Sequence, residues 1–284
     1  MSNEEKKING TKHHRGRRKK KTFKSVMGDL LLLTAIGVFI FSGYKLYSIF
    51  SEYNEGGSEY KDIVKDVIHK VEPIEDENAG ETSNEGPRYV VDFEKLMETN
   101  PDTVAWIRFE QPEIISYPVV QGQDNDKYLN TTFEGNRNSS GAIFIDVANS
   151  PEFKNRNTFI YGHNMKNGSM FGQLRKFKNS SYCTENPYFF IYTPDGICSR
   201  YQIFSVCVVE DTSYSFEMSY PTDEAYANYI SHIRSLSLYS VDVEVTTDSK
   251  IVTLSTCTNV RDDERLLVHA VKIAEDPVIG SVEE

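Results

Sequence analysis

Cys257 and Arg265 stand where two strands of a hairpin would meet. Residues 250–270 read KIVTLSTCTNVRDDERLLVHA, in which β-branched residues alternate up to Cys257, a charged turn follows, and Arg265 opens a second apolar run. If the two runs pair antiparallel, Cys257 lies opposite Arg265 at the mouth of the hairpin. A guanidinium beside a thiol favours the thiolate, which is the nucleophilic form of cysteine. The hairpin therefore predicts a reactive cysteine.

A nucleophilic cysteine needs a proton partner within hydrogen-bond reach, and the sequence contains six histidines. His13 and His14 precede a long apolar segment, and His69 falls in a predicted linker, so their distance from the folded domain excludes them. His232 falls on the polar side of a predicted helix, where we expect it to be solvated.

His269 and His163 are the remaining histidines. With Arg265 opposite Cys257, His269 pairs near Thr253, about 13 Å along the strand from the thiol, and we expect it to make a structural hydrogen bond instead. His163 directly follows a predicted strand and Gly162, in a position typical of functional loops. It is the best candidate for the proton partner.

The charge of the chain is unevenly distributed. Residues 1–50 hold 11 Lys and Arg against three Asp and Glu, although the whole chain has a net charge of −11. The acidic remainder argues against a nucleic-acid partner, because binding to phosphates requires a basic face. The basic residues at 12–24 lie directly before the apolar run 30–44, which continues to residue 50 with Lys45 as its one charged residue.

This arrangement predicts a membrane anchor. The apolar run approaches the ~20 residues that span a bilayer, and the preceding positive charges indicate a cytoplasmic N-terminus with the rest of the chain outside. A cleaved signal peptide is the competing interpretation, but no small-x-small cleavage pattern follows the run. We predict a basic cytoplasmic tail over 1–28, an anchor over 29–50, a linker with a short helix over 51–87, a folded domain over 88–276 and a tail over 277–284.

The folded domain is predicted to be mainly β, forming a closed or nearly closed barrel. Turn signals separate many short strand patterns, and one amphipathic helix is predicted over 223–236, before the cysteine strand. The predicted strands before the hairpin lie at 105–109, 117–121, 142–147, 158–161, 188–193, 201–210 and 242–247.

The other three cysteines show no spacing typical of a metal site. Cys183, Cys198 and Cys207 also form no dense disulfide framework, so we expect thiols throughout and no metal or cofactor.

Several motifs together resemble the sortases, membrane-anchored cysteine transpeptidases of Gram-positive bacteria, and class B most closely. TLSTC at 253–257 followed by Arg265 is similar to the family signature, and YGHNMKNGSMFGQL at 161–174 supplies the matching histidine element. NPDTVAWI at 100–107, YPVVQGQDNDKYL at 117–129 and GAIFID at 141–146 also look like that class. The resemblance covers roughly residues 88–276 and implies the eight-stranded sortase barrel.

The resemblance also implies the chemistry. Cys257 would attack a threonyl carbonyl in the C-terminal sorting signal of a secreted surface protein, leaving a thioester. His163 would protonate the leaving amine and then deprotonate an incoming amine, which belongs either to a cell-wall peptidoglycan precursor or to another protein. Arg265 would stabilise the oxyanion or hold the substrate backbone; Arg261, in the middle of the same loop, is the second candidate for this role.

By the same resemblance, Ser255, Asn125 and Leu129 would contact the sorting peptide, and no metal is required. Two other functions remain open from the residues. Water in place of the amine would make the chain a hydrolase of the thiol-protease type, and a tethered barrel without chemistry would bind ligands only.

Overall fold

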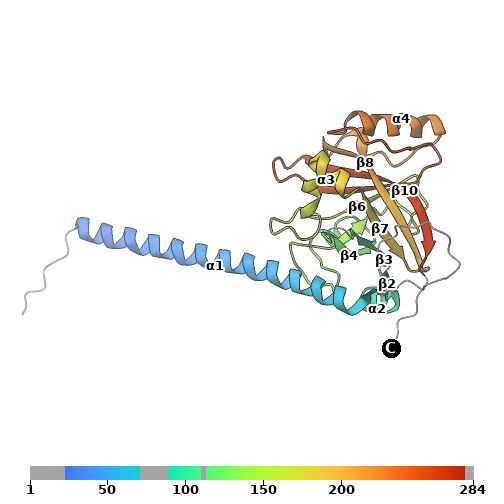
Figure 1. The fold of residues 1–284 in the computed structure, drawn as a ribbon. Helices are drawn as coiled ribbons and strands as arrows, with labels where there is room; N and C mark the ends of the chain where they lie inside the picture. Colours follow the sequence, from blue (N-terminus) through green and yellow to red (C-terminus); the bar gives the residue numbers. More distant parts are fainter. Residues whose placement is uncertain (1–22, 71–88, 110–112, 279–284) are drawn as a thin grey trace, which may run out of the picture. The chain divides into compact units, whose positions relative to one another are not determined.

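The computed structural model of the protein describes residues 23–70, 89–109 and 113–278. The chain divides into two compact units, residues 1–49 and 50–284, and Figure 1 shows the helices and strands in chain order. The helical elements are α1 (Phe23–Val67), α2 (Phe93–Thr99), η1 (Lys127–Leu129), η2 (Gly172–Lys178), α3 (Ser180–Glu185), η3 (Tyr214–Phe216) and α4 (Asp223–Ser235). The strands are β1 (Ile68–Lys70), β2 (Tyr89–Val91), β3 (Thr103–Arg108), β4 (Ser116–Val120), β5 (Ile143–Ile145), β6 (Asn157–Tyr161), β7 (Tyr188–Thr193), β8 (Ile197–Glu210), β9 (Ile251–Cys257) and β10 (Glu264–Pro277).

Eight of these strands form a closed barrel in the order β10-β8-β7-β3-β4-β5-β6-β9. Neighbouring strands are antiparallel except for β4–β5 and β6–β9, which run parallel. Closure leaves no strand edge unpaired, so the backbone hydrogen bonds of the sheet are satisfied internally. The predicted eight-stranded barrel, with helices before it and one helix before the cysteine strand, is confirmed.

The side chains of β9 alternate between the inside and the outside of the barrel. Val252 and Leu254 belong to the main hydrophobic core, whereas Ile251 packs in a second cluster with Tyr229 of α4. Helix α4 lies beside β8 (Figure 1), so both faces of the sheet are buried here. By this alternation Cys257, like Ile251, lies on the outer side of the barrel.

The helix predicted over 223–236 is confirmed to within one residue. Thr222 caps α4 by accepting a hydrogen bond from the backbone N–H of Ala225 at 3.1 Å. The strand predicted over 242–247 is wrong, because this described segment pairs with no strand of the barrel. Apolar and polar residues alternate in this segment because Val243 and Val245 pack against the hydrophobic cluster that contains Tyr229 of α4. The apolar side chains are therefore buried without a partner strand.

The C-terminal part of α1 packs on a barrel loop. The Tyr60 hydroxyl donates to the carbonyl of Gly141 at 2.7 Å and accepts from the N–H of Phe133 at 3.2 Å, and Ile63 and Val67 are buried nearby. The segment predicted as a linker over 51–87 is therefore helical as far as Val67 and a strand as far as residue 70. Residues 71–88 lie outside the described residues, as do residues 1–22 of the predicted basic tail, and the predicted domain boundaries stay predictions.

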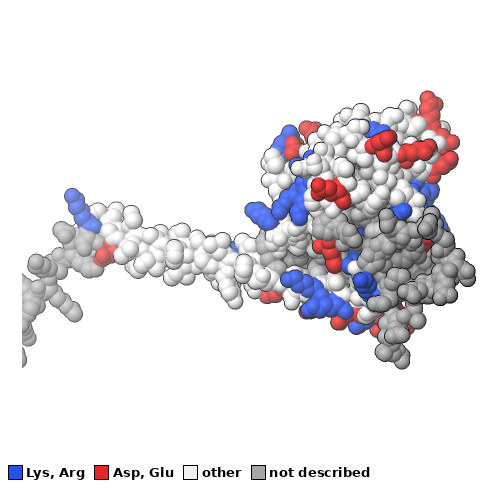
Figure 2. Space-filling model, viewed as in Figure 1, with Lys and Arg blue, Asp and Glu red and all other residues white. Residues whose placement is uncertain are grey.

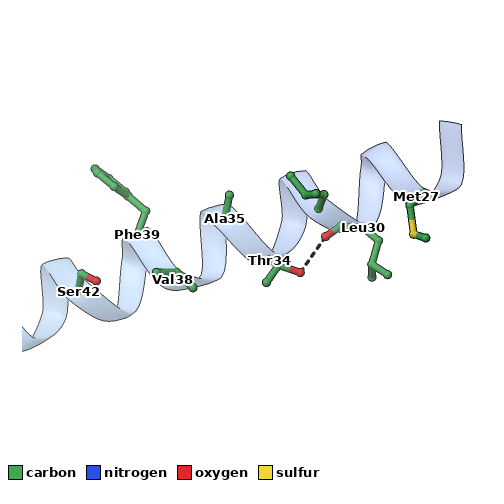
Figure 3. Close-up of a pocket in the computed structure, with 8 residues that line it drawn as sticks. Met27, Leu30, Thr34, Ala35, Val38, Phe39 and Ser42 are labelled. Atoms are coloured by element: carbon green, nitrogen blue, oxygen red, sulfur yellow. Dashed lines mark hydrogen bonds between the residues drawn. The ribbon is translucent and has the colours of Figure 1, made fainter. Parts of the chain in front are cut away.

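The N-terminal part of α1 is apolar. The described helix from residue 26 onwards is long and apolar enough to cross a membrane, a property shared by signal sequences near an N-terminus. Figure 2 shows most of this surface without charged side chains, and Figure 3 shows Leu30, Val38 and Phe39 projecting from it. The Thr34 hydroxyl donates to the carbonyl of Leu30 at 2.9 Å, which satisfies this polar group within the helix and suits an apolar surrounding.

His269 is a fully buried histidine in the middle of β10. It pairs in register with Ser205 of β8 and Thr253 of β9, and neither ring nitrogen makes a hydrogen bond of normal geometry to a described residue. Burial lowers the pKa of the His269 imidazole to about 3, because a charged ring would lose its hydration in this site.

We expect this residue to make the fold acid-sensitive. A histidine in the unfolded chain has a pKa of about 6.5. Above that pH the protein has its full free energy of unfolding, and as the pH falls from about 6.5 toward 3 this free energy decreases, because the unfolded chain binds a proton that the buried ring does not. The slope from this one group is at most about 1.4 kcal/mol of unfolding free energy per pH unit. In a His269→Gln variant, which does not titrate, this part of the pH dependence should disappear.

Urea unfolding at several pH values measures both slopes. Trp106 is the one tryptophan of the chain and is fully buried in the core, so its fluorescence reports on the barrel. Equal slopes for the wild type and the His269→Gln variant between pH 6.5 and 4 would contradict the assignment.

Candidate active site

The parallel pairing of β6 and β9 brings His163 and Cys257 to the same end of the barrel. Tyr161, the last residue of β6, pairs with Ser255 in register. His163 follows Tyr161 by two residues in the loop after β6, and Cys257 follows Ser255 by two residues at the end of β9. The ladder continues past β6, because the N–H of Gly162 donates to the carbonyl of Ser255 at 3.2 Å. The sequence prediction that both residues lie at one end of the barrel agrees with this register.

A second set of hydrogen bonds joins the histidine loop to the end of β9. The Thr256 hydroxyl donates to the carbonyl of Gly162 at 2.7 Å. The side chain of Asn164 donates to the carbonyl of Cys257 at 2.7 Å, and the side chain of Asn259 donates to the carbonyl of Asn164 at 2.9 Å. Sequence reasoning missed Asn164, although its position directly after His163 is the one signal that could have pointed to it.

The imidazole of His163 is half-buried and bound by a backbone carbonyl. Its Nε2 atom lies 2.7 Å from the carbonyl oxygen of Leu129. Because a carbonyl oxygen only accepts, Nε2 carries the hydrogen in this bond, and Nδ1 is the nitrogen that can take up or release a proton. Among the described residues no hydrogen bond joins this ring to the Cys257 thiol, so proton transfer requires the ring or the bound substrate to close the remaining distance.

Arg265 lies opposite Cys257 in the antiparallel pair of β9 and β10, as predicted. Its guanidinium donates to the carbonyls of Asp262 and Glu264 at 2.6 and 3.1 Å, and to the carboxylate of Asp211 at 3.2 Å. These bonds hold the Arg265 guanidinium at the start of β10, which lies opposite the end of β9 that carries the half-buried thiol of Cys257.

Arg261, the second candidate, is placed differently. Its side chain is 54% exposed and pairs with Asp263 at 2.6 Å and with Glu210 at 3.5 Å. It lies in the turn between the strands and has no register partner in β9. The register therefore favours Arg265, the cross-strand partner of Cys257, over Arg261.

The three residues expected to contact substrate differ in their exposure. Ser255 is only 2% exposed. Asn125 uses its amide on the segment that follows β5, donating to Asp146 and accepting from the N–H of Val147, both at 2.9 Å. Leu129 is 36% exposed, and its carbonyl binds His163. Ser255 also lies at the site, because its carbonyl accepts from the N–H of Gly162.

The remaining histidines of the folded unit have structural positions. His269 pairs with Thr253, four residues from Cys257 along the strand, as predicted. The hydrogen bond expected for its ring is limited to an interaction with the backbone of Ser205 that lacks normal geometry. His232, which we expected to be solvated, is half-buried. Its Nε2 atom lies 3.2 Å from the Ser215 hydroxyl and its ring packs against Tyr214, so the loop between β8 and α4 covers part of this side chain.

All four cysteines lie in the part of the chain that the structure describes, and no disulfide joins them. Burial raises the pKa of the Cys207 thiol to about 12 and also raises that of Cys183, because a buried thiolate loses its hydration. Neither is suited to act as a nucleophile at neutral pH. Within the described residues no three His, Cys, Asp or Glu side chains cluster in a way that could hold a metal ion.

A family model described as the sortase domain matches residues 110–273, more than half of the chain. The chain belongs to the sortase family. A sortase B from Listeria monocytogenes is 34% identical over 244 residues, which cover 85% of this chain and 94% of the relative. Family membership makes the chain an enzyme of the transpeptidase class, acting on proteins that carry a sorting signal and on an amine nucleophile.

Solved sortases share the fold. The sortase B of Bacillus anthracis in complex with AAEK1 is 30% identical and superposes with a TM-score of 0.65, covering 79% of this chain and 99% of that one. A Staphylococcus aureus sortase B–substrate complex, also 30% identical, superposes with a TM-score of 0.60 over 64% of this sortase and 84% of its own chain.

Gly162 offers a test of how tightly the histidine loop is held. A Cβ atom there would lie 2.4 Å from the side chain of Ile143 and 2.8 Å from the ring of Phe171, so Gly162→Ala forces neighbouring core side chains to move. We expect this variant to lose about 1–3 kcal/mol of unfolding free energy and to turn over more slowly, because His163 is the next residue.

The matched control is Gly57→Ala in α1, where a Cβ atom meets nothing within 4 Å and alanine favours the helix. Urea denaturation and peptide turnover of the two variants provide the comparison. A Gly162→Ala enzyme as stable and as active as the Gly57→Ala enzyme would contradict the close packing of this loop.

Proposed function

We propose that the protein is a class B-like sortase that cleaves a sorting signal after threonine and transfers the cargo protein to an amine of the cell wall. The observation that supports this most is the convergence of Cys257, His163 and Arg265 at one end of β6, β9 and β10. The relatives named above support the same reaction, and one of them has been solved with a substrate.

In the first half of the reaction the Cys257 thiolate attacks the threonyl carbonyl carbon, so that a C–S bond forms and the scissile C–N bond breaks. The leaving amine takes a proton from Nδ1 of His163, while Nε2–H stays on the carbonyl of Leu129. In the second half an incoming amine returns its proton to Nδ1 and attacks the thioester. An amide forms, the C–S bond breaks, and the thiolate is restored.

Arg265 stabilises the negative charge that develops on the carbonyl oxygen. Its three bonds to Asp262, Glu264 and Asp211 use both hydrogens of Nη1 and one of Nη2. The second Nη2 hydrogen and the Nε hydrogen are thus available for the oxyanion or the substrate backbone.

The apolar part of α1 acts as an uncleaved anchor in the cell membrane. The positive charges before it set a cytoplasmic N-terminus, so the barrel lies on the outer side, where secreted surface proteins and peptidoglycan precursors meet. On this proposal Ser255, Asn125 and Leu129 border the sorting peptide.

Hydrolysis of the thioester is the second candidate, and a tethered barrel that only binds peptides is the third. A peptide library with threonine at a fixed position, incubated with and without glycylglycine, separates the three by mass spectrometry. Transfer products support the transpeptidase, free acids alone would favour the hydrolase, and the lack of any Cys257 adduct would favour the binding protein.

Substitutions at Cys257 and Arg265 test the mechanism. Cys257→Ala should lower the rate of peptide cleavage by roughly 10³-fold or more. The urea midpoint of unfolding should not change, because removing this half-buried side chain at the end of a strand leaves no cavity in the core. Arg265→Lys keeps the charge but lacks the fork of donors, and we expect a loss of about 10²-fold in kcat. A Cys257→Ala enzyme that still cleaves, or an Arg265→Lys enzyme at the wild-type rate, would refute the assigned roles.

A further inference from the structure

Asp211 directly follows β8 and is tied to the hairpin that carries Cys257. Residues Val209 and Glu210 pair in register with Arg265 and Glu264 of β10. Beyond the last pair, the N–H of Asp211 donates to the carbonyl of Asp263 at 2.9 Å. The backbone of Asp211 is therefore fixed relative to the start of β10, which lies opposite Cys257.

The side chain of Asp211 makes a second contact to the same hairpin. Its carboxylate lies 3.2 Å from Nη2 of Arg265. The other two bonds of that guanidinium go to carbonyls of the neighbouring turn, those of Asp262 and Glu264, and both involve Nη1. Of these three acceptor groups, the Asp211 carboxylate is the charged one, and the other two are backbone carbonyls. Asp211 is also the acceptor that comes from another part of the chain and the one that binds the Nη2 group.

The carboxylate of Asp211 is also accessible. Its side chain is 41% exposed and lines a cleft of about 560 Å³ together with Tyr214, Phe216 and Met218. A partly exposed ion pair contributes little to folding stability, so stability alone does not account for the contact. Its main effect is on the orientation of a long side chain that otherwise has many rotamers.

We propose that Asp211 is a positioning residue for Arg265. Its carboxylate turns the guanidinium so that the Nε hydrogen and the second Nη2 hydrogen are presented beside Cys257, where the oxyanion forms. This inference rests on the role of Arg265 in the proposed function, and Asp211 itself touches neither the substrate nor the thiol.

The test uses the full-length protein in detergent micelles, with glycylglycine as the amine and the threonine peptide that the library selects. Asp211→Asn should lower kcat about tenfold, because a misplaced donor weakens transition-state binding, with KM changed less than about twofold. Asp211→Glu, which keeps the charge, should recover part of the loss. Asp263→Asn is the matched control, because the Asp263 carboxylate interacts electrostatically with Arg265 but makes its hydrogen bonds to Arg261. It removes the same charge from the same region without removing a hydrogen bond of Arg265, and it should keep the wild-type kcat.

A double-mutant cycle distinguishes positioning from a merely structural role. If Asp211 acts through Arg265, Asp211→Asn should lower kcat no further in an Arg265→Ala background. The inference is overturned if Asp211→Asn has the wild-type kcat, or if it lowers the kcat of the Arg265→Ala enzyme by the same factor as it lowers that of the wild type. If the Arg265→Ala enzyme is fully active, both the role of Arg265 and this inference are overturned. If the Arg265→Ala enzyme is slow but the Asp211→Asn enzyme is fully active, this inference alone is overturned.

Discussion

The parallel pairing of β6 with β9 is the constraint on which the site depends. Two strands that run in the same direction end at the same rim, so the residues that follow them emerge side by side. The hydrogen bond from Gly162 to Ser255 carries this pairing one residue beyond β6. An antiparallel pair would have sent His163 to the opposite end of the barrel, far from Cys257.

The hairpin of β9 and β10 could be predicted from the sequence because its information is local. Two apolar runs separated by a charged turn define one register, and the observed pairing of Cys257 with Arg265 is the predicted one. The alignment of β6 with β9 involves segments far apart in the chain, and strand patterns alone do not encode it. Resemblance to the family supplied the eight-stranded barrel and strengthened the choice of His163.

Several features could not be predicted because they arise from packing between distant segments. The alternation at Val243 and Val245 is typical of a strand, but a helix covers these side chains in place of a partner strand. His232 lies on the more polar side of α4 and is half-covered by a loop that no periodicity indicates. Asn164 and Asp211 are ordinary loop residues in the sequence, and only their tertiary hydrogen bonds distinguish them.

The packing of the C-terminal part of α1, from Phe50 onwards, on the barrel bears on how a soluble form of the enzyme could be prepared. A fragment that starts at residue 88 would lack Tyr60, and the backbone groups of Phe133 and Gly141 that it binds would be left without this partner. It would also lack the carboxylate of Glu59, which accepts hydrogen bonds from Thr132 and Glu134. A fragment that begins at Phe50, where the compact unit starts, retains these contacts while omitting most of the apolar stretch that would aggregate in water.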